Sequence, residues 1–253
     1  MRRTLRKATG VLLGASLLVA PAIAAAAVTL DGTPGDDSLI GTAAADVIRA
    51  GAGDDFVVGL GGDDLLLLGA GHDEALAGPG NDMVRGGYGP DEIRLGPGHD
   101  VLFAGPGPDV AMGGTGPDML GGGPGRDMLM GDDSEDIMFG RDGDDYLIGG
   151  AGADLLYGGP GDDTLTDWQP ASLDSTAPAD ADVLRGGLGA DFAGVSQGAD
   201  HVFLGDGDDE VKLADDGAVD TIRCGAGLDS VTYYGAIDPL DVLVDCEDVT
   251  LAQ

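Results

Sequence analysis

The stretch AGAGDDFVV at residues 50–58 is one copy of a nine-residue unit that repeats without a break from Gly32 to Thr166, where the last copy reads GGPGDDTLT. The sixth place is Asp in every copy, the eighth is always apolar, and the fourth is Gly in all copies but two. A fixed period of this kind is typical of short units that stack on one another. The sequence therefore predicts a solenoid rather than a domain built around one closed core.

Each unit divides into a turn and a short strand. The first six places are rich in the turn formers Gly, Pro and Asp, and Gly also permits positive φ angles. Proline occupies the third or fifth place, as at Pro34 and Pro90, and never places seven to nine, because strand backbone must donate hydrogen bonds there. We therefore expect strands at places seven to nine, with the central side chain pointing inward and the flanking two outward.

The composition agrees with a thin solenoid. The chain has 48 Gly and only 4% aromatic residues, which is too little bulky apolar material for a conventional core. Its net charge of −34 disfavours binding to nucleic acid or to an anionic membrane and favours the binding of cations. The acids recur in phase with Gly and apolar places, unlike those of a disordered acidic chain.

The unit resembles the consensus G-G-x-G-x-D-x-U-x, with U apolar, of the hemolysin-type (RTX) calcium-binding repeat family. The resemblance covers all fifteen copies between Gly32 and Thr166. It implies an all-β fold, a parallel β-roll solenoid in which two units of nine residues close one coil of 18. The sixth-place Asp residues would then stack in two columns, one along each edge of the roll.

The resemblance also implies several calcium ions, each held between adjacent turns by sixth-place Asp carboxylates and turn carbonyls. Calcium prefers such oxygen ligands, and no His, Cys or Met recurs at a fixed place to favour a softer metal. The expected metal ligands carried over to this sequence are Asp37, Asp55, Asp64, Asp73, Asp82, Asp91, Asp100, Asp109, Asp118, Asp127, Asp145, Asp154, Asp163, Asp191, Asp200 and Asp209. Asp46 and Asp136 depart most from the consensus, with Ala44 and Ser134 at the fourth place. Stacked carboxylates without ions would repel one another, so we expect calcium binding and folding to be coupled.

Other segments flank the main roll of residues 32–166. Residues 1–27 combine a basic start, a short apolar run and small residues at cleavage sites, as in a signal peptide. Residues 167–181 break the period and form a loop or a linker. Asp182 lies 19 residues beyond Asp163, one coil plus one residue, so either the roll continues with this segment looped out or the segment joins two rolls.

The C-terminal part of the chain begins with further repeats at residues 182–212. Residues 213–253 alternate like strands, contain few turn glycines, and are expected to form a β cap over the open end of the roll. Cys224 and Cys246 are the only cysteines. In an exported chain we expect them to form a disulfide that stabilises the fold by about 3 kcal/mol.

We expect a secreted, extracellular and non-catalytic calcium-binding protein whose roll folds outside the cell. The sequence contains neither H-E-x-x-H nor G-x-S-x-G, and repeats and cap leave no room for a catalytic domain. The mature form should neither insert into a membrane nor bind nucleic acid. The alternative is an adhesin or polysaccharide-binding module that uses the outer faces of the roll. Ninth-place residues from Phe103 to Phe139 are partly apolar and would suit a packing or oligomer face.

Overall fold

A computed structural model describes all residues except 1–2, 5–15, 20–25, 168–179, 215–216 and 253. The described residues form parallel β-solenoid coils of 18 residues, as the sequence predicts, and contain no helix that could cross a membrane. The chain divides into two compact units, residues 1–121 and residues 122–253. Most of the predicted signal segment, and most of residues 167–181, lie outside the described residues.

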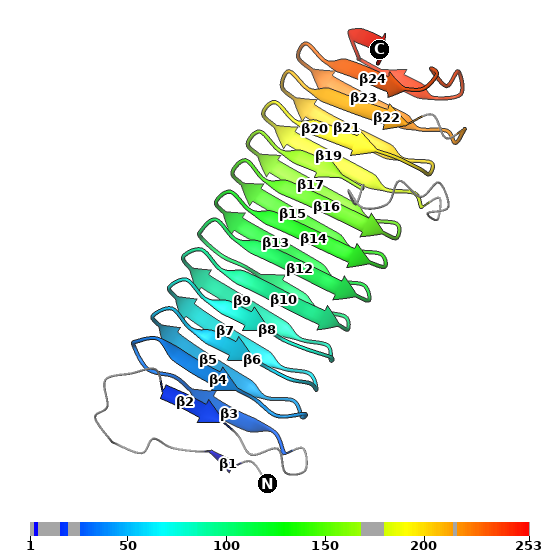
Figure 1. Cartoon of the computed structure of the whole chain (residues 1–253). Helices are drawn as coiled ribbons and strands as arrows, with labels where there is room; N and C mark the ends of the chain where they lie inside the picture. The colour runs from blue at the N-terminus through cyan, green and yellow to red at the C-terminus, as the bar shows by residue number, and fades with distance from the viewer. Residues whose placement is uncertain (1–2, 5–15, 20–25, 168–179, 215–216, 253) are drawn as a thin grey trace. The chain divides into compact units, whose positions relative to one another are not determined.

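In the first unit the odd-numbered strands form one parallel sheet, the odd sheet, and the even-numbered strands form a second, the even sheet (Figure 1). The odd sheet consists of β1 (Arg3–Thr4), β3 (Val28–Asp31), β5 (Val47–Ala52), β7 (Leu65–Ala70), β9 (Met83–Tyr88) and β11 (Val101–Phe103), and β11 also pairs with residues 119–121 at the start of β13 (Met119–Pro124). The even sheet consists of β2 (Ser16–Val19), β4 (Asp37–Ile40), β6 (Phe56–Val58), β8 (Glu74–Leu76), β10 (Glu92–Pro97) and β12 (Val110–Thr115).

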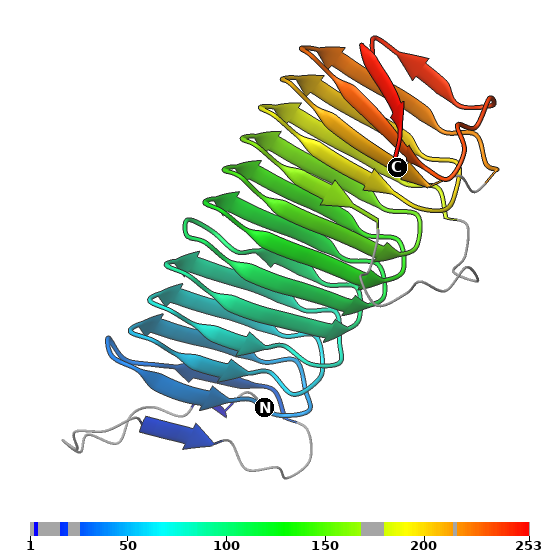
Figure 2. The same ribbon diagram turned by 45° about the horizontal axis from the view of Figure 1, so that its top comes forward.

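The second unit also contains an odd sheet and an even sheet, seen from another side in Figure 2. Its odd sheet contains β15 (Ile137–Asp142), β17 (Leu155–Pro160), β19 (Val183–Leu188), β21 (His201–Asp206), β23 (Thr221–Ala226) and β25 (Val242–Val244). Its even sheet contains β14 (Met128–Asp133), β16 (Tyr146–Ala151), β18 (Thr164–Thr166), β20 (Phe192–Val195), β22 (Glu210–Ala214), β24 (Ser230–Tyr234) and β26 (Asp248–Leu251).

The strand register shows which strands are neighbours across the break in the period at residues 167–181. β19 pairs with β17, and β20 pairs with β18, so the two sheets continue on both sides of the break. Asp182 lies beside Asp154, 28 residues away instead of the regular 18, and Asp191 lies beside Asp163 at the same spacing. The expectation that Asp182 follows Asp163 by one coil plus one residue is therefore wrong. The sheets keep their register across the break, with ten additional residues between β18 and β19.

The strands are longer than the three residues that we expected. Many run on through the first, second and third places of the next unit, as β7 does from Leu65 to Ala70. Pro97 ends β10 at a third place, where it needs no N–H and its carbonyl accepts a hydrogen bond from the N–H of Gly80. Turn residues therefore take part in the sheets wherever the next coil can pair with them.

Three places of every nine-residue repeat point inward, and their side chains stack into three columns that form the core. The eighth-place side chains are fully buried, as predicted, with Leu66 and Leu156 as examples. The sixth-place Asp residues are also buried. A third column, the first place, was not recognised from the sequence, although Leu68 and Leu95 are fully buried there. Each nine-residue repeat thus buries one apolar side chain, one small or apolar residue and one carboxylate.

Close approach of the backbones of adjacent coils explains the glycines at the second and fourth places. Gly69 has φ +125°, and a Cβ on it would lie 1.9 Å from the carbonyl oxygen of Gly51 in the preceding coil. At the same two places Leu60, Arg141 and Ser134 hold positive φ angles of 84°, 87° and 93° without being Gly. These residues sit in sterically unfavourable backbone, which costs about 1–3 kcal/mol each.

Gly69→Ala is expected to destabilise the first unit by at least about 1–3 kcal/mol, because alanine resists this φ and its Cβ would clash with Gly51. Gly35→Ala is the matched control, since nothing lies within 4 Å of a Cβ at that fourth-place glycine. Thermal unfolding in saturating calcium measures both changes. Equal losses for the two variants would contradict this explanation of the glycines.

The tail continues both sheets, with β25 paired to β23 and β26 paired to β24. Cys224 in β23 and Cys246 after β25 form a disulfide, which confirms the predicted pairing. Cys224 is fully buried, and Tyr233 in β24 is buried with its hydroxyl donating to the carboxylate of Asp241 at 3.0 Å. These contacts tie the last strands to the roll.

Loss of the disulfide is expected to lower the free energy of unfolding of the second unit by about 3 kcal/mol, because the open chain gains entropy when it unfolds. Both Cys224→Ala with Cys246→Ala and mild reduction of the unaltered protein remove the crosslink, and only the variant also leaves a small cavity at Cys224. Denaturant unfolding followed by circular dichroism compares the two. An unchanged midpoint after complete reduction would show that the disulfide does not stabilise the fold.

Candidate metal sites

The sixth-place carboxylates of the first unit form two ladders. In each, one carboxylate oxygen accepts the backbone N–H of the Asp 18 residues earlier, at 2.7–3.0 Å. One ladder contains Asp37, Asp55, Asp73, Asp91 and Asp109, and the other contains Asp46, Asp64, Asp82, Asp100 and Asp118. Every rung therefore places one buried carboxylate next to the turn of the preceding coil.

The second unit has the same two ladders. One contains Asp127, Asp145, Asp163, Asp191, Asp209 and Asp229, and the other contains Asp136, Asp154, Asp182, Asp200 and Asp220. The tail ends both of them: Glu247 accepts the N–H of Asp229 at 3.0 Å, and Asp241 accepts the N–H of Asp220 at 3.0 Å. We did not predict the roles of Glu247 and Asp241, because neither belongs to a recognisable repeat.

The second oxygen of many of these carboxylates is buried and accepts no hydrogen bond from any described residue. This holds for Asp55, Asp64, Asp73, Asp82, Asp91, Asp100, Asp145, Asp154, Asp163, Asp191, Asp209 and Asp229. A buried oxygen that has neither water nor a donor is unfavourable, and more so when it is charged. Each of these atoms is therefore a strong acceptor that lacks a positive partner among the described residues.

Burial raises the pKa of the first eleven of these carboxyls, from Asp55 to Asp209, and the charges of neighbouring aspartates raise it further, against the lowering effect of the N–H bond. The pKa of Asp64 rises to about 7 with Asp82 and Asp46 as charged neighbours, and that of Asp91 rises to about 7 with Asp109 and Asp73. The pKa of Asp154 rises to about 8. At neutral pH the ladders therefore cannot be fully ionised unless cations compensate the charge.

Backbone carbonyls supply the other oxygens of each turn. The carbonyl oxygen of Gly53 lies 2.0 Å from where a Cβ of Gly71 would be, and the carbonyl of Gly71 has the same relation to Gly89 at 1.9 Å. Fourth-place carbonyls thus face the turn of the following coil. Among the described residues no three acidic, His or Cys side chains gather at one point, so an ion here must rely on carbonyls as well as carboxylates.

Asp46 is an exception, and its repeat also departs from the consensus in sequence, with Ala44 at the fourth place. Its carboxylate accepts hydrogen bonds from the N–H of Val28 at 2.6 Å, from the N–H of Thr42 at 2.5 Å and from the Thr42 hydroxyl at 3.1 Å. The side chain of Thr42 is buried above it. Donors of the protein itself therefore satisfy this carboxylate, which makes the turn around Asp46 the poorest candidate for a cation.

A second, exposed ladder at the fifth place was not expected. Asp36 accepts the N–H of Asp54 at 2.9 Å, and Asp54 accepts the N–H of His72 at 2.8 Å. Asp144 and Asp162 repeat the contact in the second unit. Because these carboxylates are exposed, water can solvate them, and they serve to join turns rather than to demand a cation.

The donor set fits calcium. Calcium takes six to eight oxygen ligands from carboxylates and backbone carbonyls in flexible geometry, and both kinds of oxygen line these turns. Zinc and copper sites usually contain His or Cys, and Cys224 and Cys246 are joined in the disulfide. The turns are therefore suited to hard cations.

Comparison with known proteins agrees with this chemistry. The family model described as the RTX calcium-binding nonapeptide repeat (4 copies) matches residues 31–66, 40–75, 76–111, 103–138, 112–147, 130–165 and 179–211, which together cover more than half of the chain. No curated protein matches the chain.

Proposed function

Because this chain belongs to the RTX calcium-binding nonapeptide repeat family, we propose that it is a secreted, non-catalytic protein whose β-roll units fold when calcium ions bind between their turns. The observation that carries the proposal is the series of buried carboxylates whose second oxygen has no partner in the described part of the chain, as at Asp82 and Asp163. Folding would require these charges to be compensated, and calcium ions would compensate them.

The residues that would hold the ions are the sixth-place aspartates, together with the turn carbonyls beside them. The proposed ligands remain the sixteen aspartates from Asp37 to Asp209 named above, and Asp229 joins them because its second oxygen is also buried without a partner. Asp46 is left out, since Thr42 and Val28 satisfy its carboxylate. The ions would supply positive charge and cross-link adjacent coils.

Secretion is supported by the signal-like residues 1–27 and by the disulfide between Cys224 and Cys246, a bond that persists in oxidising surroundings. The calcium concentration outside cells is also in the range of the dissociation constants of weak calcium sites, about 10⁻⁴–10⁻³ M. The three histidines, His72, His99 and His201, are all exposed. We therefore assign the buried carboxylates to ion binding rather than to acid–base catalysis.

The test is a calcium titration of the chain from residue 28 to residue 253, followed by calorimetry and by circular dichroism. We expect little strand signal in excess chelator and a cooperative rise in the millimolar range of calcium. Magnesium at equal ionic strength is the matched control, because it screens charge equally but demands a smaller, more regular site. An unchanged strand signal in excess chelator would overturn the proposal.

A second candidate function is an interaction module that uses an outer face of the roll. It is favoured by one observation: an outer face of the second unit presents arginines that have no carboxylate partner among the described residues, in a chain with 46 acidic and only 12 basic residues.

A further inference from the structure

The outward ninth-place column of the odd sheet in the second unit is a row of aromatic and arginine side chains. Strand pairing places them on consecutive strands in the order Phe139, Tyr157, Arg185, Phe203 and Arg223. The rings of Phe139 and Tyr157 stack at 5.0 Å between centroids. The guanidinium of Arg185 lies over both Tyr157, at 5.8 Å, and Phe203, at 4.6 Å, and that of Arg223 lies 5.9 Å from the Phe203 centroid.

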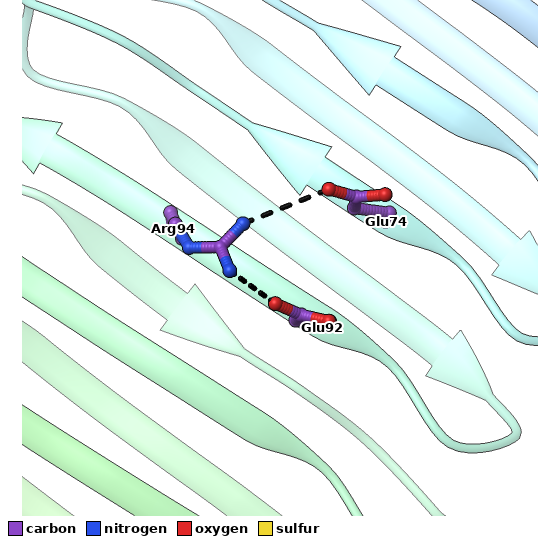
Figure 3. Close-up of polar contacts among 3 residues, drawn as sticks. All are labelled: Glu74, Glu92 and Arg94. Atoms are coloured by element: carbon purple, nitrogen blue, oxygen red, sulfur yellow. Dashed lines mark hydrogen bonds and ion pairs between the residues drawn. The ribbon is translucent and has the colours of Figure 1, made fainter.

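These two arginines differ from the basic residues of the even sheets. In the first unit, Arg94 is held between Glu74 and Glu92, as Figure 3 shows. In the second unit, Lys212 lies over Phe192 and pairs with Glu210 at 3.2 Å. Arg185 and Arg223 instead lie over aromatic rings and form no ion pair with a described residue, so their N–H groups remain available to an external anion.

The outward seventh-place column next to the row contains no acidic side chain. It consists of Ile137, Leu155, Val183, His201, Thr221 and Val242. The acidic residues of these strands are confined to strand ends, at Asp142 and Asp206. In a chain of net charge −34 this face therefore repels a polyanion less than a face that carries acidic side chains.

The size and form of the face favour a narrow, linear ligand. Six strands at about 4.8 Å spacing make a strip of only a few hundred Å², whereas a stable protein–protein interface needs about 800 Å² on each side. Strands β17, β19 and β21 are hydrogen-bonded on both sides, so they offer no backbone edge to an extended peptide. A peptide lying flat here would gain no backbone hydrogen bonds, whereas a polysaccharide needs none.

We propose that this row binds an acidic polysaccharide, with its carboxylates paired to Arg185 and Arg223 and its sugar rings lying against the apolar ring edges between them. The two arginines are two strands apart, about 10 Å, which is close to the length of one disaccharide in an extended chain. Tyr157 and Phe203 lie against the guanidinium of Arg185, and Phe203 lies against that of Arg223, so that less side-chain entropy is lost on binding. The proposal requires a folded roll but does not depend on which ions fold it.

The test compares four soluble polymers in calcium-containing buffer by calorimetry: hyaluronan, carboxymethyl-dextran, uncharged dextran and poly-L-glutamate. We expect binding to the two carboxylated polysaccharides, weakening with added salt, and none to dextran. Poly-L-glutamate carries the charge without sugar rings and should bind at least about tenfold more weakly. Equal or tighter binding of poly-L-glutamate would overturn the polysaccharide assignment in favour of an acidic polypeptide.

The variants locate the site. Arg185→Gln and Arg223→Gln should each weaken binding about tenfold, the worth of one charge-assisted hydrogen bond. Lys212→Gln, on the other sheet and already paired with Glu210, is the matched control and should leave affinity unchanged. Circular dichroism of each sample separates a failure to fold from a failure to bind. A folded protein that binds neither carboxylated polysaccharide, or binds them equally well without both arginines, would overturn the proposal.

Discussion

Asp91→Asn is expected to stabilise the calcium-free protein at pH 8 and to destabilise the calcium-loaded one. Asp91 is buried, one oxygen accepts the N–H of Asp73 at 3.0 Å, and the other has no partner among the residues that the structure describes. Asparagine keeps the acceptor and the shape but removes the charge. Without calcium the fold loses a buried charge that nothing compensates, and with calcium the ion loses a charged ligand.

The expected size is at least a tenfold loss of calcium affinity at the turns beside Asp91, with a lower midpoint of unfolding in calcium and a larger strand signal in chelator. Asp54→Asn is the matched control. Its carboxylate makes the same contact, accepting the N–H of His72 at 2.8 Å, but it is exposed. We expect its stability to change by no more than about 0.5 kcal/mol in either condition. If Asp91→Asn weakened the protein equally in chelator and in calcium, the carboxylate would have a purely structural role.

The calcium-free protein is expected to gain strand structure on acidification, the reverse of ordinary acid denaturation. Burial first, and neighbouring carboxylates second, raise the pKa of Asp100 to about 7 and that of Asp200 to about 8 in the folded state. In the unfolded chain the same groups have a pKa of about 3.9. At pH values between the unfolded and the folded pKa, the folded state binds more protons than the unfolded chain, so the free energy of unfolding falls as the pH rises.

The contribution of these groups to the stability of the calcium-free fold is complete below about pH 4 and is lost as the pH passes through about 7 to 8. Circular dichroism in excess chelator at pH 4.5 and at pH 8 measures it, and we expect the larger strand signal at pH 4.5. Repeating the pair in about 1 M salt separates burial from general charge repulsion, because salt screens exposed charges but not buried ones. A strand signal that decreased steadily with acid in both buffers would show that the carboxyls are not destabilising when ionised.

In calcium the direction reverses. Protons compete with the ions for the same carboxylate oxygens, so calcium affinity should fall as the pH is lowered from 8 to 5. The two pH dependences together distinguish a ladder that requires neutralisation by any means from one that requires calcium in particular.

Much of the site could be predicted from the sequence because the repeat makes every coil alike. Asp82, Asp100 and Asp163 occupy the same place in the unit, and the structure buries all three in the same way. The departures at Ala44 and Ser134 were visible too. What replaces an ion at Asp46 was not visible, since Thr42 satisfies that carboxylate through a rotamer and a backbone contact that no spacing reveals.

The ends of the ladders could not be predicted for a related reason. Glu247 and Asp241 accept the N–H groups of Asp229 and Asp220, but they lie 18 and 21 residues beyond them, in a tail without repeats. Their roles depend on where the last strands pair, and a parallel sheet tolerates turns of different length between paired strands. Only the paired strands reveal which residues become neighbours.

By itself the sequence determined the nine-residue period, the inward eighth place, the glycines of the turns and the carboxylate of every sixth place, because these follow from local stereochemistry repeated at each coil. The tertiary structure decided which residues stand on adjacent strands. A period of 18 residues would place Ser175 beside Tyr157, but the ten additional residues shift the register so that Arg185 takes that position. Hydrogen bonds between strands set this register, and they are made across the coils rather than along the chain.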